Sequence, residues 1–161
     1  MSLRIGDKAP DFSLYSSEKE LINLHDYQGR NVVLLFFPLA FTSTCTKEMC
    51  ATRDDMDVYN ELNTEVFGIS IDTPSSLARW KQDQNLNFKL LSDFNKEVIR
   101  AYDVVFEEYG LGMKGVGKRA VYVIDGDGFI RHMEVLEKAG DMPDLKAIKD
   151  SLRSLMVAGI K

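Results

Sequence analysis

The sequence is poor in cysteine and histidine and has no excess of basic residues. Two cysteines in 161 residues are too few for a disulfide scaffold. The two histidines, His25 and His132, lie far along the chain from Cys45 and Cys50, so neither a four-ligand zinc site nor any other metal site is expected. A formal net charge of −5 argues against a surface that binds nucleic acid.

Long apolar runs are also absent. No stretch approaches the roughly 20 apolar residues that a membrane helix needs, and the opening segment MSLRIGDKAPDF lacks the apolar core of a signal peptide. We therefore expect a cytoplasmic protein that does not bind membranes. The 45% apolar content suffices for a real core, and no linker, repeat or low-complexity segment divides the chain, so residues 1–161 are predicted to form one domain.

The hydrophobic pattern alternates between strands and helices. Residues 32–37 and 66–71 form continuous apolar runs that are typical of central strands covered on both faces. The runs at 120–124 and 129–135 flank Asp-Gly-Asp-Gly and predict a late hairpin. Expected helices cover residues 45–62, with N-caps offered by Thr42, Ser43 and Thr44, and residues 74–84, 95–102 and 144–157. This order predicts an α/β fold with a mixed central sheet, flanked by helices and extended by an N-terminal hairpin at 12–14 and 21–24.

Cys45 is the leading candidate for a reactive residue. It falls in the first turn of the predicted helix after a buried strand, where unpaired backbone N–H groups and the helix dipole favour a thiolate. This turn also lies at the carboxyl edge of the sheet, where ligands of open α/β folds bind. A buried, inert cysteine is the alternative.

The segment FFPLAFTSTC contains Pro38-x-x-x-Thr42-x-x-Cys45. With the opening GDKAPDFSL, LLSDF at 90–94 and the strand RAVYVID at 119–125, it resembles the peroxiredoxin family over nearly the whole chain. The resemblance implies a thioredoxin-like fold and a cofactor-free thiol peroxidase that reduces hydrogen peroxide and small organic hydroperoxides. It also implies a monomer or a homodimer.

The resemblance assigns a role to each residue of the motif. Cys45 would attack one peroxide oxygen and become a sulfenic acid. Thr42 would accept a hydrogen bond from the peroxide, and Pro38 would shield the thiolate from water. Arg119 would stabilise the thiolate and the charge on the displaced oxygen, and Glu48 would orient Arg119.

Cys50 is the candidate resolving thiol. Five helical residues place the two Cα atoms about 8.7 Å apart, beyond the limit of about 7 Å for a disulfide. The first turns of the helix would therefore have to unwind during each cycle. The spacing resembles the peroxiredoxin Q or bacterioferritin comigratory branch, which resolves within the chain and is recycled by thioredoxin. FFPLAFT instead resembles the AhpE-type one-cysteine branch, which uses an external thiol.

Two other motifs and two rival functions carry less weight. Gly110-x-Gly112-x-x-Gly115 precedes a strand, unlike a dinucleotide fingerprint, and residues 110–117 are predicted to form a mobile loop that leads to Arg119. Asp125-x-Asp127-Gly128 fits a hairpin turn better than a calcium loop. A dithiol oxidoreductase would require C-x-x-C, which is absent from the helix. A non-catalytic redox sensor would not need Pro38, Thr42 and Arg119.

Overall fold

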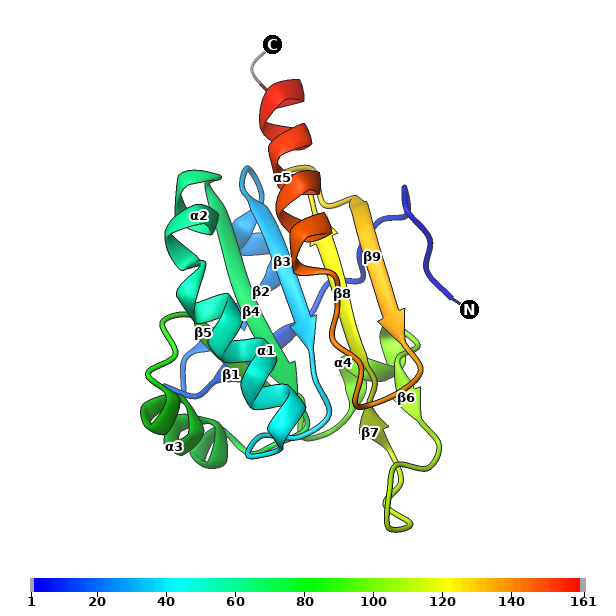
Figure 1. Ribbon diagram of the computed structural model, residues 1–161. Helices are drawn as coiled ribbons and strands as arrows, with labels where there is room; N and C mark the ends of the chain where they lie inside the picture. The colour runs from blue at the N-terminus through cyan, green and yellow to red at the C-terminus, as the bar shows by residue number, and fades with distance from the viewer. Residues whose placement is uncertain (1, 160–161) are drawn as a thin grey trace.

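The computed structural model describes residues 2–159, and a seven-stranded sheet forms its centre (Figure 1). The strands are β1 (Ser13–Ser16), β2 (Leu21–Asn23), β3 (Asn31–Phe36), β4 (Thr64–Ser70), β5 (Lys89–Ser92), β8 (Arg119–Ile124) and β9 (Ile130–Leu136). Their order across the sheet is β2-β1-β5-β4-β3-β8-β9. The helices are α1 (Ser43–Asp54), α2 (Met56–Glu61), α3 (Pro74–Gln84), α4 (Glu97–Ala101) and α5 (Leu145–Gly159), with a 3-10 turn η1 (Leu24–Tyr27).

The sheet is mixed, as predicted. Strands β3, β4 and β5 are parallel, whereas β8 is antiparallel to β3 and forms a hairpin with β9. The predicted N-terminal hairpin is β1 with β2, and it joins the main sheet through the pairing of β1 with β5. Because β8 runs against β3, the start of β8 lies at the edge where β3, β4 and β5 end. We call this edge the carboxyl edge.

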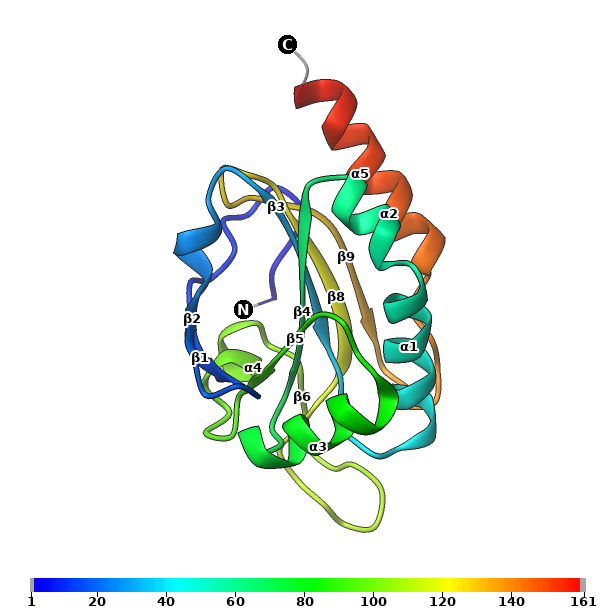
Figure 2. The same cartoon turned by 90° about the vertical axis from the view of Figure 1, so that its left-hand side faces the viewer.

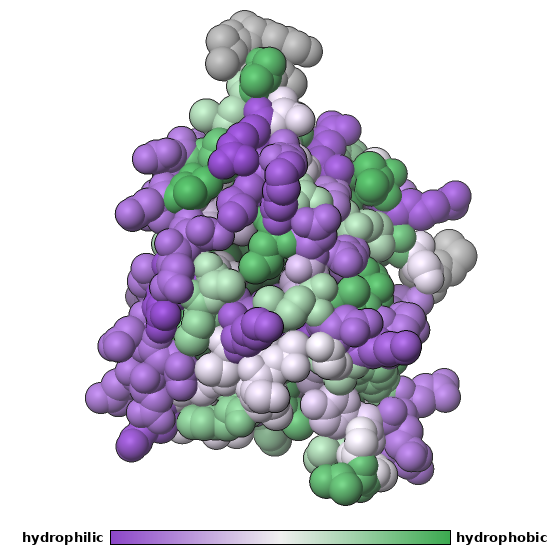
Figure 3. Space-filling model, in the orientation of Figure 1, coloured by the Kyte–Doolittle hydropathy of each residue, from purple (hydrophilic) through white to green (hydrophobic). Residues whose placement is uncertain are grey.

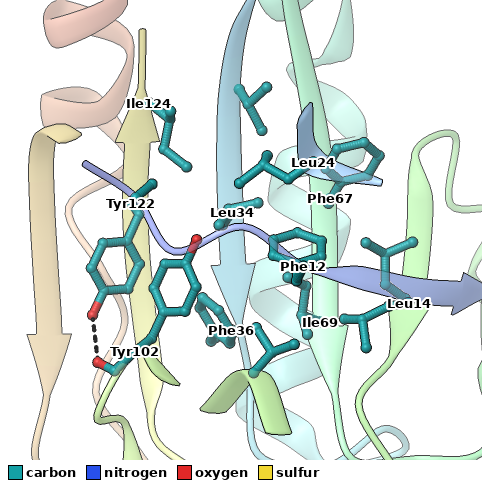
Figure 4. Close-up of a cluster of buried hydrophobic side chains, with 14 of the residues drawn as sticks. Phe12, Leu14, Leu24, Leu34, Phe36, Phe67, Ile69, Tyr102, Tyr122 and Ile124 are labelled. Atoms are coloured by element: carbon teal, nitrogen blue, oxygen red, sulfur yellow. Dashed lines mark hydrogen bonds between the residues drawn. The ribbon is translucent and has the colours of Figure 1, made fainter. Parts of the chain in front are cut away.

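Helices cover both faces of the sheet, as expected for an α/β fold. In Figure 2, α1, α2 and α5 lie on one side of the sheet, and α4 lies on the other. Each face of the sheet has its own hydrophobic core, and alternate residues of β3 point to opposite faces. Val33 and Leu35 pack in the core with α1 and α5, whereas Leu34 and Phe36 belong to the other core. Figure 4 shows this second core, in which side chains from the N-terminal segment and α4 meet the sheet.

The single helix predicted to run through residue 62 is wrong, because Asp55 separates α1 from α2. Asp55 has φ −101° and ψ 5° and leaves the helical conformation. Its carboxylate instead binds Lys149 Nζ on α5 at 2.6 Å. Aspartate has a low helix propensity, and the ion pair with α5 favours the break.

The prediction of a loop at residues 110–117 is also wrong in part, because a small hairpin includes this region. Strands β6 (Val105–Phe106) and β7 (Val116–Gly117) pair, and Tyr109 forms a further bridge with Met113. Gly112 and Gly115 have positive φ, which explains why glycines recur in the turn. Hydrophobic residues gather at the hairpin tip in Figure 3, where Leu111 is 98% exposed. Within residues 2–159, no helix is long and apolar enough to cross a membrane.

Candidate active site

Cys45 lies at the carboxyl edge, in the first turn of α1. The chain leaves β3 at Phe36, turns through the loop that carries Pro38 and Thr42, and enters α1 at Ser43. The side chain of Cys45 is fully buried and faces the sheet. The placement of this thiol in the first helical turn therefore agrees with the sequence analysis, and its neighbours are the unpaired N–H groups of that turn.

Arg119 is brought to Cys45 by the topology of the sheet. It is the first residue of β8 and is 1% exposed. Its Nη2 donates to Cys45 Sγ at 3.3 Å and to the backbone oxygen of Ala139 at 2.9 Å. Its Nη1 donates to Glu48 Oε1 at 2.7 Å. The guanidinium is thus held by three groups, and one of them is the thiol.

Burial and charge act in opposite directions on this ion pair. Burial raises the pKa of Glu48 to about 7, although the charge and hydrogen bond of Arg119 oppose the shift. Burial dominates because Glu48 is completely buried and its Oε2 atom has no hydrogen-bond partner among the described residues. Burial tends to lower the pKa of Arg119, but Glu48 and Cys45 outweigh this and raise it. Arg119 therefore remains a cation beside the sulfur.

The Thr42 hydroxyl is oriented as an acceptor. Its Oγ1 atom donates its hydrogen to the backbone oxygen of Leu39 at 2.7 Å, which leaves its lone pairs available. Thr42 occupies the N-cap position of α1, but its side chain accepts no capping bond from the backbone N–H groups of the helix. Pro38 is buried in the same loop. The expected capping by the Thr42 hydroxyl is therefore wrong, but the loop places Pro38 and Thr42 directly before Cys45.

Cys50 lies on α1, as Cys45 does, but its side chain contacts α3. Both cysteines are free, and Cys50 is partly exposed. Its Sγ donates to Gln84 Oε1 on α3 at 3.4 Å. Because α1 is intact between the two residues, the thiols have separate surroundings in this conformation.

Two residues of this region had a weak sequence signal or none. Trp80 on α3 is buried, and its Nε1 atom donates to Thr46 Oγ1 in α1 at 3.3 Å. Asp72 was not predicted, although its Oδ2 accepts from the backbone N–H of Ala40 in the loop at 2.8 Å. The available signal was a carboxylate directly after a buried strand, at the edge where ligands bind.

The arrangement supports nucleophilic chemistry at sulfur. A thiol that faces a fixed cation and backbone N–H groups can react as a thiolate, and the same groups can stabilise negative charge on an oxygen bound beside it. Within residues 2–159, the His, Cys, Asp and Glu side chains form no group of three that could hold a metal ion.

Comparison with known sequences identifies relatives over most of the chain. Residues 5–133 match the AhpC/TSA family. Peroxiredoxin Bcp of Escherichia coli (strain K12) is 40% identical over 132 residues, which cover 81% of this chain and 85% of that protein. A putative peroxiredoxin of Mycobacterium tuberculosis (strain H37Rv) is 41% identical over 127 residues, covering 78% of this chain and 80% of that protein.

Solved structures agree with these relatives. The crystal structure of peroxidoxin BcpB from Mycobacterium tuberculosis has a TM-score of 0.84 and 28% identity, over 95% of this chain and 98% of that chain. The structure of Enterococcus faecalis AhpC has a TM-score of 0.87 over 99% and 96% of the two chains, and at 22% identity it shows the shared fold. The predicted thioredoxin-like fold class is confirmed.

Proposed function

Because the chain belongs to the AhpC/TSA family of peroxiredoxins, it is a thiol-dependent peroxidase, and we propose that Cys45 is the thiol that attacks the peroxide. The contact of 3.3 Å between Arg119 Nη2 and Cys45 Sγ is the observation that carries this assignment. The sulfur of Cys50 instead donates to the neutral amide oxygen of Gln84 at 3.4 Å, although the charge of Arg53 also acts on this thiol.

In the first step, the Cys45 thiolate forms a bond to the terminal peroxide oxygen while the O–O bond breaks. That oxygen stays on the sulfur as a sulfenic acid, and the other oxygen leaves as hydroxide or alkoxide and takes up a proton. Thr42 accepts a hydrogen bond from the peroxide O–H, and Arg119 stabilises the charge on the leaving oxygen. Pro38 lacks an N–H and limits the access of water. Glu48 orients Arg119.

In the second step, we propose that the Cys50 thiol displaces water from the Cys45 sulfenic acid and forms a disulfide within the chain. The five-residue spacing supports this role only if the first turns of α1 unwind, because the intact helix keeps the thiols apart. A dithiol reductant such as thioredoxin then returns both cysteines to thiols.

The proposal also covers the compartment, the oligomeric state and the partners of the protein. Free thiols suit a reducing compartment, and we place the protein in the cytoplasm as one domain over residues 1–161. Exposed hydrophobic residues on loops near the carboxyl edge, such as Phe41 and Leu111, are compatible with a homodimer as well as a monomer. The acidic net charge of −5 does not suit nucleic acid as a partner.

Intact mass and free-thiol counting after one equivalent of hydrogen peroxide test the proposal. The wild type should lose both thiols and two hydrogens, Cys50→Ser should hold a sulfenic acid, and Cys45→Ser should not react rapidly. A wild type that gains one oxygen and keeps Cys50 free would assign resolution to an external thiol. Slow oxidation of Cys45 in the wild type would overturn its role as the attacking thiol.

A further inference from the structure

The loop between β3 and α1 holds an aromatic residue in an unfavourable backbone conformation. Phe41 has φ 68°, in the left-handed region that a bulky side chain rarely adopts. Phe41 is 57% exposed, so burial of its ring does not account for this conformation. Its neighbour Thr42 is the N-cap residue of α1, and any relaxation at Phe41 would move the Thr42 hydroxyl relative to Cys45. Contacts on either side of Phe41 must therefore hold the loop.

Two hydrogen bonds hold the loop, one on each side of Phe41. On the helix side, Thr42 Oγ1 donates to the backbone oxygen of Leu39. On the strand side, the N–H of Ala40 donates to Asp72 Oδ2 at 2.8 Å. Asp72 follows β4 and lies 32 residues from Ala40 in sequence, so this bond ties the loop to the neighbouring strand.

We propose that Asp72 is a positioning residue for the peroxidase reaction, which fixes the Pro38–Thr42 loop through the N–H of Ala40. The distance of 2.8 Å from the Ala40 nitrogen to Asp72 Oδ2 is that of a well-formed N–H···O hydrogen bond. This bond directs the backbone of Ala40 just before the left-handed residue. Asp72 touches neither the sulfur nor the peroxide in this mechanism, and it acts through the position of Thr42.

Asp72 is itself fixed by the sheet. Ser70 Oγ donates to Asp72 Oδ2 at 2.6 Å, and Ser92 Oγ donates to the backbone oxygen of Asp72 at 2.6 Å. The N–H of Asp93 further joins β5 to the backbone oxygen of Ser70 at 2.7 Å. The carboxylate therefore belongs to a network anchored at the ends of β4 and β5, and a rigid support of this kind suits a group that positions a site.

This inference rests on the proposed role of Thr42 as acceptor for the peroxide. If Asp72 acts through the loop, its loss should slow the reaction with peroxide, which needs Thr42 in place. It should hardly change the alkylation of Cys45 by iodoacetamide, which needs the thiolate but no peroxide site. A general loss of structure would instead change the peroxide rate and the alkylation rate together.

Asp72→Ala, Asp72→Asn and Asp125→Ala form the test set. We expect Asp72→Ala to lower the second-order rate constant for Cys45 oxidation by about ten-fold to a hundred-fold, with an alkylation rate within about three-fold of the wild type. Asp72→Asn keeps an oxygen acceptor for Ala40 and should recover most of the peroxide rate. Asp125 is a matched control, because it accepts the N–H groups of Asp127 and Phe129 in the turn between β8 and β9, away from the site.

The outcomes separate this inference from the assignment of Cys45. Rapid peroxide oxidation of Asp72→Ala would overturn the positioning role while leaving Cys45 as the attacking thiol. Equal losses in the peroxide and alkylation rates would also overturn it, because they would indicate a structural role. Slow oxidation of the wild type would instead remove the assignment on which the inference rests. If Asp72→Ala does not fold, a peroxide rate of Asp72→Asn below that of Asp125→Ala would contradict the expected rescue.

Discussion

Arg119 Nη2 lies 3.3 Å from Cys45 Sγ, although 74 residues separate the two in sequence. The same guanidinium reaches Glu48 through Nη1 and Ala139 through Nη2. The two charged side chains are almost completely buried, at 1% exposure for Arg119 and 0% for Glu48. The cation that faces the sulfur therefore has little freedom to move, and its geometry depends on a planar group with several donors.

Arg119→Lys should slow the oxidation of Cys45 by about a hundred-fold. A lysine keeps the positive charge, but its compact ammonium cannot reach Glu48, Ala139 and the sulfur with the same geometry. The rate of sulfenic acid formation, followed by rapid quenching and intact mass, measures the effect. Lys118→Ala is the neighbouring control, since Lys118 forms an exposed ion pair with Glu137 and should change the rate by less than about two-fold. A lysine variant as fast as the wild type would show that charge alone suffices.

Glu48→Gln should remove a pH dependence of stability. The pKa of Glu48 is about 7 in the folded protein, against an ordinary value of 4.5. The folded state therefore binds more protons than the unfolded state between these values, and stability falls as the pH rises from about 4.5 to about 7, by up to about 3 kcal/mol. Glutamine does not titrate, so the variant should gain stability relative to the wild type over this range.

Urea denaturation under reducing conditions at pH 5, 6, 7 and 8 provides the measurement. The difference in unfolding free energy between Glu48→Gln and the wild type should change steadily up to about pH 7 and then level off. Glu137→Gln is the control, because it makes the same substitution at an exposed carboxylate outside the buried pair. Parallel curves for Glu48→Gln and the wild type would mean that Glu48 is already ionised at pH 5.

Local signals made part of this site predictable from the sequence. The apolar run before Pro38 indicated a central strand, and the threonines after it placed Cys45 in the first turn of a helix. The apolar run at 120–124 likewise indicated a late strand, and Arg119 directly precedes that run. Its contact with Cys45 then follows from the antiparallel pairing of β8 with β3.

Other features depend on contacts that no local pattern encodes. The break at Asp55 accompanies an ion pair with Lys149, 94 residues away. The bond from Ala40 to Asp72 joins the ends of two neighbouring strands. The left-handed conformation of Phe41 is held by such contacts against its intrinsic preference, so propensity points to the wrong conformation there.

Gly68→Ala should lower the free energy of unfolding by about 1 to 3 kcal/mol, because β4 has no room for a side chain at this position. A Cβ atom at Gly68 would lie 2.7 Å from Leu90 Cδ2 and 3.3 Å from Phe37 Cε1, and both neighbours are buried. Denaturant titration measures the loss. Gly110→Ala is the control, since a Cβ atom there meets nothing within 4 Å. Similar stabilities for the two variants would show that the core of α1 and β4 can expand.

Lys47→Gly should speed disulfide formation about five-fold relative to Lys47→Ala. Lys47 is an exposed residue of α1 between the two cysteines, so both variants remove the same side chain from the segment that must unwind. Glycine destabilises a helix by about 1 kcal/mol relative to alanine. The open population of this segment should therefore rise by about five-fold, and the disulfide should form faster by the same factor if unwinding limits the second step.

The rate can be followed by Trp80 fluorescence after one equivalent of hydrogen peroxide, because Trp80 is the sole tryptophan and its Nε1 atom donates to Thr46 in α1. The same pair of substitutions at Lys146 in α5 tests specificity, since Lys146 is also exposed and helical but lies outside the unwinding segment. Equal rates for the two Lys146 variants and a faster Lys47→Gly would assign the limiting step to α1. If the glycine and alanine variants also react equally fast at Lys47, the disulfide forms without this unwinding or another step is slower.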